Sequence, residues 1–215
     1  MAQHKETERV REIYNTTAAD YDRGIAFTEK LLFGDGRAWV CSQARGQVLE
    51  IAIGTGRNLP FYPAEVELTG IELSPAMLEI ARQRAQRLGR QVELLRGDAQ
   101  ALPFPDQRFD TVVCTLALCS IPDERQAITE VWRVLRPGGI FVALEHVRSP
   151  NPIIRGIERL LEPWALRTQG DHLLREPVEA AQAAGFCIDA LQRRKLGVVE
   201  RLMARKAGEP PSPAL

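Results

Sequence analysis

A short run with two glycines follows an apolar segment near residue 50 and has the residue types of a ligand-binding turn. The run reads Glu50-Ile51-Ala52-Ile53-Gly54-Thr55-Gly56-Arg57-Asn58. Glycine has no Cβ atom, so a chain can turn sharply there and bring its backbone close to a bound molecule. The run stands where a buried strand would end, and open parallel sheets bind ligands at such ends. The acids that follow decide which ligand fits.

Two acidic residues end the next two apolar segments. Glu72 ends the second segment, and a carboxylate there can accept hydrogen bonds from two neighbouring ribose hydroxyls. Asp98, in the run Gly97-Asp98-Ala99, follows the third segment and can accept a hydrogen bond from an exocyclic amine. Together the two acids predict a nucleoside ligand.

A dinucleotide is the alternative ligand for such a turn. Its fingerprint is G-x-G-x-x-G, whose glycines make room for a pyrophosphate. Read from Ala52, the sequence lacks two of the three glycines, and read from Gly54 it has Leu59 at the last position. A nucleoside without phosphates therefore fits better.

Short apolar segments alternate with helical segments and must position these residues. We expect strands over 48–53, 66–71, 92–95, 110–115, 140–145, 186–193 and 198–204, and helices over 6–15, 26–44, 75–88, 123–135, 153–164 and 177–184. Ser74 is a typical helix N-cap, and Gly89 a typical helix end. The pattern predicts an α/β fold, a Rossmann-like three-layer sandwich. Its mostly parallel seven-stranded sheet carries a C-terminal antiparallel hairpin and helices on both faces.

The composition argues against some classes of function. The 215 residues carry 28 basic and 28 acidic side chains, a balance that argues against a nucleic-acid partner. We expect one domain over 1–207, with N-terminal lid helices over about 5–45, and a disordered tail over 208–215. The N-terminus does not resemble a secretory signal, and the four cysteines form no CxxC pair, so we expect a cytoplasmic protein with no metal site. The oligomeric state stays open.

The ordered motifs resemble those of class I methyltransferases that use S-adenosylmethionine (SAM), over about residues 10–205. The motifs are Glu50-x-Ala52-x-Gly54-x-Gly56, Glu72, Gly97-Asp98-Ala99, Phe109-Asp110 and Leu135-Arg136-Pro137-Gly138-Gly139. The resemblance implies SAM as cofactor and S-adenosylhomocysteine as product. One departure is Ala52, which stands where the family has its first motif glycine.

The resemblance also implies a role for each matching residue. The methionine and ribose portions of SAM would be contacted by Glu50, Ala52, Gly54, Gly56 and Asn58, and Glu72 would bind the ribose hydroxyls. Adenine contacts fall to Leu73, Met77, Asp98 and Ala99, and further methionine contacts to Thr115 and Leu116. Tyr14 and Tyr21 resemble the N-terminal lid of quinone and phospholipid methyltransferases, although packing of a helix explains two tyrosines equally well.

A narrower resemblance concerns the methyl acceptor. The runs 112–120 and 145–147, with Gly170-Asp171 and Arg175-Glu176, are similar to alkyl-thiol S-methyltransferases, and the group also resembles phospholipid and quinone methyltransferases. A small apolar or lipid-like acceptor is implied, with a thiol as first choice. A SAM-binding protein without catalysis is a further alternative. Candidate acceptor-site residues are Cys119, Ser120, Glu145, His146, Trp164, Asp171 and His172, and His146 is the best candidate base.

The helix expected over 153–164 has apolar residues on one face. Packing against the sheet, a lid over an apolar acceptor, or contact with a membrane surface would each use that face. Packing or a lid is favoured, because Glu158 and Glu162 weaken the positive charge of Arg155, Arg159 and Arg167. Peripheral membrane contact, without stable insertion, stays open.

Overall fold

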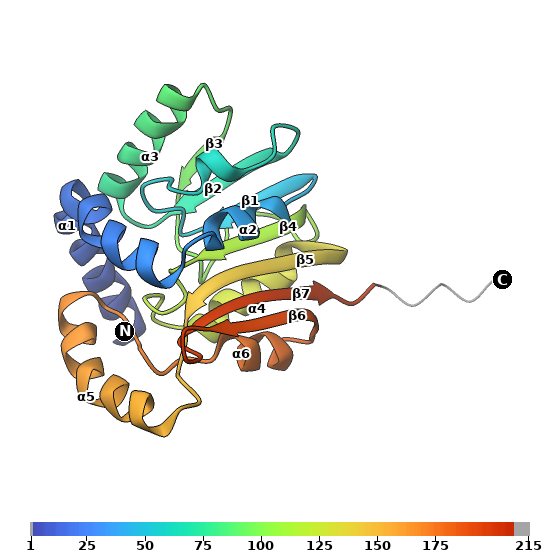
Figure 1. The fold of residues 1–215 in the computed structure, drawn as a ribbon. Coiled ribbons are helices and arrows are strands. Elements are labelled where there is room, and N and C mark those ends of the chain that lie inside the picture. The colour runs from blue at the N-terminus through green and yellow to red at the C-terminus, as the bar shows by residue number, and fades with distance from the viewer. Residues whose placement is uncertain (1, 209–215) are drawn as a thin grey trace.

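The computed structural model describes residues 2–208, so nearly all of the predicted tail over 208–215 lies outside the described part. A seven-stranded sheet has the order β3-β2-β1-β4-β5-β7-β6 (Figure 1). The strands are β1 Gln47–Ile51, β2 Glu67–Glu72, β3 Glu93–Arg96, β4 Phe109–Thr115, β5 Leu135–His146, β6 Phe186–Arg194 and β7 Val199–Lys206. Strands β1 to β5 pair in parallel, and β7 pairs antiparallel with both β5 and β6. The expected fold class is confirmed.

The helices are α1 Ala2–Leu32, α2 Gly36–Ser42, α3 Pro75–Leu88, α4 Glu124–Val134, α5 Pro152–Thr168 and α6 Pro177–Ala183, with a 3-10 turn, η1, at Leu59–Phe61. Ser74 caps α3 as expected, because its Oγ accepts a hydrogen bond from the Met77 amide at 3.2 Å. Gly89 ends the same helix in the left-handed conformation.

Two apolar clusters fill the space between the sheet and its helices. Successive residues of one strand point to opposite faces, so Val113 belongs to the cluster with α2 and α3 while Val112 belongs to the cluster with α4 and α6. Both valines are fully buried. The sheet is therefore covered on both faces, which explains why its central strands are apolar along their whole length.

The N-terminal region differs from the expected pair of helices over 6–15 and 26–44. One long helix, α1, runs to Leu32, and a turn with Gly34 at φ 52° separates it from the short α2. The polar stretch between the two expected helices does not interrupt α1. The hydroxyls of Thr16 and Thr17 bond to carbonyls one turn earlier and so stay within the helix.

Helices α1 and α5 lie beyond the ends of the strands rather than on a face of the sheet (Figure 1). They touch where the Arg9 side chain donates a 2.8 Å hydrogen bond from Nη1 to the carbonyl of Leu166. Within residues 2–208, no helix is both long enough and apolar enough to cross a membrane.

Candidate active site

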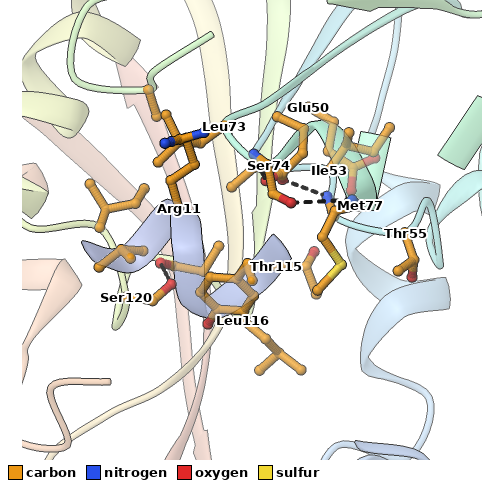
Figure 2. A pocket seen from close by; sticks show the side chains of 18 of the residues that line it. Arg11, Glu50, Ile53, Thr55, Leu73, Ser74, Met77, Thr115, Leu116 and Ser120 are labelled. Atoms are coloured by element: carbon orange, nitrogen blue, oxygen red, sulfur yellow. Dashed lines mark hydrogen bonds between the residues drawn. The ribbon is translucent and has the colours of Figure 1, made fainter. Parts of the chain in front are cut away.

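A pocket opens at the carboxyl ends of β1, β2 and β4, beneath α1 (Figure 2). We name it the strand-end pocket. Thirteen residues predicted from the sequence to belong to the cofactor site, the lid or the acceptor site line it: Tyr14, Tyr21, Glu50, Ala52, Gly54, Glu72, Leu73, Met77, Asp98, Ala99, Thr115, Leu116 and Ser120. Residues far apart in the chain meet here because parallel strands end at one edge of the sheet.

Glu72 is a buried carboxylate on the pocket wall. Its Oε2 accepts a 2.9 Å hydrogen bond from the Gly54 amide, and its Oε1 accepts a 2.8 Å bond from the Ser74 amide. Burial raises the pKa of Glu72, while these amides lower it. Each oxygen accepts one backbone hydrogen bond and keeps a second lone pair, so the carboxylate is oriented and can still accept from a ligand.

The turn after β1 has the open backbone that its glycine predicted. Gly54 adopts φ 59°, and a Cβ atom built there meets nothing closer than 4.0 Å. A side chain at this position would therefore occupy the space of the pocket. Ala52 also adopts a left-handed φ, 50°, which explains why glycine is the better residue there.

Asp98 lines the far end of the pocket after β3. Its Oδ1 accepts hydrogen bonds from the Gln100 amide at 2.9 Å and from the Gln100 side chain at 3.0 Å. These bonds fix the orientation of the Asp98 carboxylate, and the pocket brings it together with Glu72.

The resemblance implied that Gly56 and Asn58 contact the ligand, but neither residue lines the pocket. Gly56 packs beneath α3, where an added Cβ would lie 2.8 Å from Leu59 and 3.3 Å from Ala81. Asn58 is fully buried and donates from Nδ2 to Glu50 Oε1 at 2.8 Å and to Thr115 Oγ1 at 2.9 Å. The two residues therefore shape the wall from behind.

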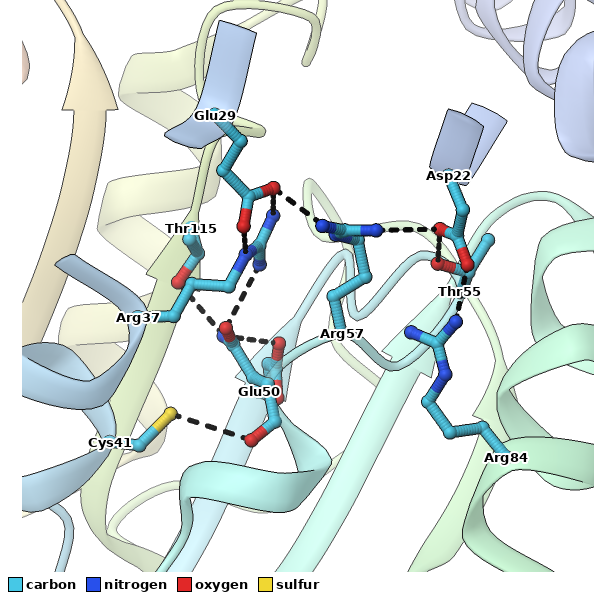
Figure 3. A network of polar contacts seen from close by, with 10 residues as sticks. Asp22, Glu29, Arg37, Cys41, Glu50, Thr55, Arg57, Arg84 and Thr115 are labelled. Carbon is cyan, nitrogen blue, oxygen red and sulfur yellow. Dashed lines mark hydrogen bonds and ion pairs between the residues drawn. The ribbon is translucent and has the colours of Figure 1, made fainter. Parts of the chain in front are cut away.

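A polar network connects Glu50 to α1 (Figure 3). Arg37 donates from Nη1 to Asn58 Oδ1 at 2.9 Å, and its other nitrogens bond to Glu29 of α1. Burial raises the pKa of Glu50 to about 7, although the Tyr62 hydroxyl, 2.8 Å away, and Arg37 lower it. The position of α1 is thus coupled to the acid that opens the glycine motif.

Three polar residues on one stripe of α1 hold the helix over the pocket. Asn15, Asp22 and Glu29 recur every seven residues, so they share one face. Asn15 Oδ1 accepts a 2.6 Å bond from the Ser74 hydroxyl, and Asp22 accepts a 2.7 Å bond from the Thr55 hydroxyl. This seven-residue repeat is the signal in the sequence for the attachment, but neither the repeat nor Arg37 was predicted to belong to the site, and Ser74 was predicted only as a helix cap.

A second pocket lies on the other side of Tyr14, Tyr21 and Leu116, which line both pockets. We name it the α1 pocket, because Ile13, Thr17, Gly24 and Thr28 of that helix form one wall. The opposite wall holds Cys119 and His146 from the ends of β4 and β5, with Thr168, Gln169, Asp171 and Leu173. The two tyrosine rings lie edge to face, 6.1 Å apart.

The α1 pocket gathers groups that can exchange a proton. His146 is half-buried, its Nδ1 has no hydrogen-bond partner among residues 2–208, and burial lowers its pKa. Burial raises the pKa of Asp171 to about 6, and this carboxylate accepts a 3.4 Å bond from the Tyr14 hydroxyl. Burial also raises the pKa of the Cys119 thiol, which keeps it protonated.

The remaining acceptor-site candidates lie elsewhere. Ser120 lines the strand-end pocket, and Glu145 is buried, accepting hydrogen bonds from the Ala117 and Leu118 amides. Trp164 is 60% exposed on α5, and His172 lines neither pocket. The described residues hold no cluster of three or more His, Cys, Asp or Glu side chains suited to a metal ion.

Comparison with known proteins identifies the family. A methyltransferase-domain family matches residues 49–143, the stretch from the glycine motif to β5. The human thiol S-methyltransferase TMT1A is 32% identical over 173 residues, which cover 77% of this chain and 70% of the human protein. The chain belongs to the class I SAM-dependent methyltransferases.

Further relatives differ in what they methylate. A phosphatidylethanolamine N-methyltransferase from Cereibacter sphaeroides is 37% identical to this methyltransferase over 118 residues, covering 54% of this chain and 58% of the relative. A solved structure from Thermotoga maritima, described as a possible histamine N-methyltransferase, has a TM-score of 0.70 at 20% identity, covering 91% of this chain and 99% of that one. This structural likeness establishes the fold alone.

Proposed function

We propose that this methyltransferase holds SAM in the strand-end pocket and transfers its methyl group to a small apolar acceptor in the α1 pocket. The observation that carries the proposal is the shared wall. Tyr14, Tyr21 and Leu116 line both pockets, so two bound molecules would meet across these side chains. Methyl transfer requires such proximity and alignment above all.

The residues of the strand-end pocket fit a nucleoside with a charged amino-acid tail. Glu72 would hold the ribose hydroxyls through its free lone pairs, and the open backbone at Gly54 would let the ligand lie close. Asp98, with Leu73, Met77 and Ala99, would hold the adenine end, while Thr115 and Leu116 would lie near the methionine portion. SAM, when bound, supplies an already activated methyl group on its sulfonium.

A thiol is the acceptor that these side chains suit best. A neutral imidazole at His146 would accept the thiol proton, and a thiol, with a pKa near 8.5, needs little help to ionise. No carboxylate orients the His146 ring from Nδ1, since that atom has no partner in the described chain. Such a weak base supports a thiol over a ring carbon, whose proton is harder to remove. The thiol S-methyltransferase relative supports the same choice.

A quinone or a phospholipid head group is the second candidate acceptor. The phosphatidylethanolamine N-methyltransferase relative supports it, and so do the exposed apolar side chains of α5 described below. Asp20 and Asp171 line the α1 pocket and would favour a cationic head group there.

A panel of acceptors tests the proposal. Alkyl and aryl thiols, demethylated quinols and phosphatidylethanolamine would each be incubated with SAM, and release of S-adenosylhomocysteine would be measured. We expect turnover with apolar thiols. Turnover with quinols or lipid alone would move the assignment to the second candidate. No turnover with any acceptor, alongside tight SAM binding by calorimetry, would leave a SAM-binding protein without catalysis.

A further inference from the structure

Five large apolar side chains stand on one face of α5 and point into solvent. Ile153, Ile157, Leu160, Leu161 and Trp164 are between 48% and 79% exposed. Their spacing of four, three, one and three residues keeps them on one side of a helix. We name this set the α5 stripe. Either packing against the sheet or a role as a lid was favoured for this face, and packing is wrong, because the helix lies beyond the strand ends and buries its other side.

The charges around the α5 stripe are mostly positive. Glu158, expected to weaken the basic face, is only 6% exposed and accepts a 3.0 Å hydrogen bond from the Ser149 amide. Arg159 and Arg167 are exposed, while Arg155 and Glu162 are half-buried. Arg167 lies next to the stripe, three residues after Trp164, and Arg159 is exposed on the flank of the helix away from it. An apolar stripe on a helix with exposed arginines complements a bilayer whose head groups are anionic.

The α5 stripe leads to the α1 pocket. Thr168, which lines that pocket, stands one helical turn after Trp164 on the same face of α5. Across the pocket, Leu31 of α1 is 57% exposed and lies one turn after the pocket-lining Thr28. Helices α1 and α5 lie on the same side of the molecule (Figure 1). Exposed apolar side chains therefore border the α1 pocket on both of its helices.

We propose that the α5 stripe docks this methyltransferase on an anionic lipid surface, with Arg159 and Arg167 reaching the head groups. The mouth of the α1 pocket then lies against the bilayer, and an apolar acceptor enters from the lipid. Docking itself requires no methyl transfer, and only the entry of the acceptor rests on the function proposed above. A second copy of the chain is the competing occupant, but it would gather the arginines of both copies around one contact.

Vesicle co-sedimentation tests the docking. The probes are vesicles of phosphatidylcholine mixed with phosphatidylglycerol and vesicles of phosphatidylcholine alone. We expect binding to the mixed vesicles, weakened by salt, and little binding to the neutral ones. The Arg159→Gln/Arg167→Gln variant should bind the mixed vesicles roughly fivefold more weakly for each arginine removed. The Ile157→Gln/Leu160→Gln variant should bind more than about tenfold more weakly.

A matched control is Leu88→Gln, which removes a 47% exposed leucine at the end of α3 and should leave vesicle binding unchanged. Because all of these side chains are exposed, the variants should keep the wild-type unfolding temperature. Undiminished binding of the Ile157→Gln/Leu160→Gln variant overturns the proposal. So does a wild-type dimer in solution that this variant converts to a monomer, since a second copy then covers the stripe.

The delivery of the acceptor has its own readout. Ile157→Gln/Leu160→Gln should slow turnover of an acceptor carried in mixed vesicles and leave turnover of a water-soluble thiol unchanged. Equal loss with both acceptors overturns delivery from the bilayer. If no acceptor is methylated while vesicle binding follows the pattern above, the proposed function fails and the docking stands.

Discussion

Glu29 of α1 and Arg37 of α2 form a two-bond ion pair, with 2.7 Å from Nε to Oε1 and 2.9 Å from Nη2 to Oε2. Both side chains are largely buried, at 13% and 10% exposure. The same guanidinium bonds to Asn58, which in turn bonds to Glu50. The position of α1 and the shape of the glycine motif therefore depend on one another through this network (Figure 3).

Replacing Glu29 should loosen α1. Glu29→Gln leaves the buried Arg37 without its counter-charge, so we expect the free energy of unfolding to fall by up to about 3 kcal/mol. Hydrogen exchange of the α1 amides should quicken, and S-adenosylhomocysteine should bind more weakly. Glu12→Gln, at an exposed position of the same helix, is the control. Unchanged α1 exchange in Glu29→Gln would contradict the coupling.

Acid should open α1 in the wild-type protein. Burial raises the pKa values of Asp22 and Glu29, but hydrogen bonds outweigh this effect and hold both pKa values below the ordinary range. Asp22 is bonded to Thr55 and Arg84, and Glu29 to Arg37. A carboxylate with a lowered pKa stabilises the fold above its unfolded value and loses that contribution as the pH falls through its folded value. Proteolysis within α1 should therefore rise below about pH 4. A cleavage rate that stays constant from neutral pH to below about pH 4 would contradict this expectation.

Glu72→Gln should weaken cofactor binding. One oxygen becomes an amide NH₂ that faces a backbone N–H of Gly54 or Ser74, and one acceptor for the ribose is lost. We expect the Kd for S-adenosylhomocysteine to rise roughly tenfold or more in calorimetry. The control Glu67→Gln changes an exposed glutamate at the other end of β2 and should bind normally. Equal affinity in both variants would mean that the ribose lies elsewhere.

Ala52→Gly should stabilise the protein. A left-handed φ costs an alanine about 1–2 kcal/mol, which the substitution would recover. Part of the recovered free energy is offset by the larger unfolded-state entropy of glycine. The free energy of unfolding should therefore rise by up to about 1 kcal/mol in urea titrations. The same change at Ala26, which is exposed within α1, should instead destabilise. A loss of stability in Ala52→Gly would show that the Ala52 methyl contributes packing that outweighs the strain.

The pH dependence of thiol methylation should report His146. Only the neutral imidazole accepts a proton, and burial lowers its pKa, so activity should persist below the ordinary histidine value of about 6.5 before it falls. His146→Asn should remove this acidic limb and lower kcat/KM, while SAM affinity stays constant because His146 does not line the strand-end pocket. An acidic limb that survives the substitution would assign it to another group, with Asp171 next in line.

Local sequence determined the strands, the helices after residue 45 and the positions of Glu72 and Asp98 at the strand ends, whereas the N-terminal helices differ from those expected. A strand end, a cap at Ser74 and an acid at Glu72 are set by residues near one another in the chain, so their spacing was sufficient. Tyr14 and Tyr21 were found by resemblance, but the pocket that they share with His146 depends on contacts across the whole chain. Gly56 and Asn58 belong to the predicted motif, but they lie behind the wall of the strand-end pocket. Gly56 packs against α3, and Asn58 donates a hydrogen bond to Thr115.

The direction in which a helix faces was decided by the tertiary structure. Periodicity identified the apolar face of α5, whereas the polar stripe of α1 was recognised only in the structure. A periodic pattern contains no information on what lies opposite a helix face. Glu158 bonds to Ser149 inside the protein and leaves Leu160 in solvent, while Glu29 reaches inward to Arg37. These choices depend on long-range contacts between elements, because only they determine which side of an amphipathic helix the rest of the molecule covers.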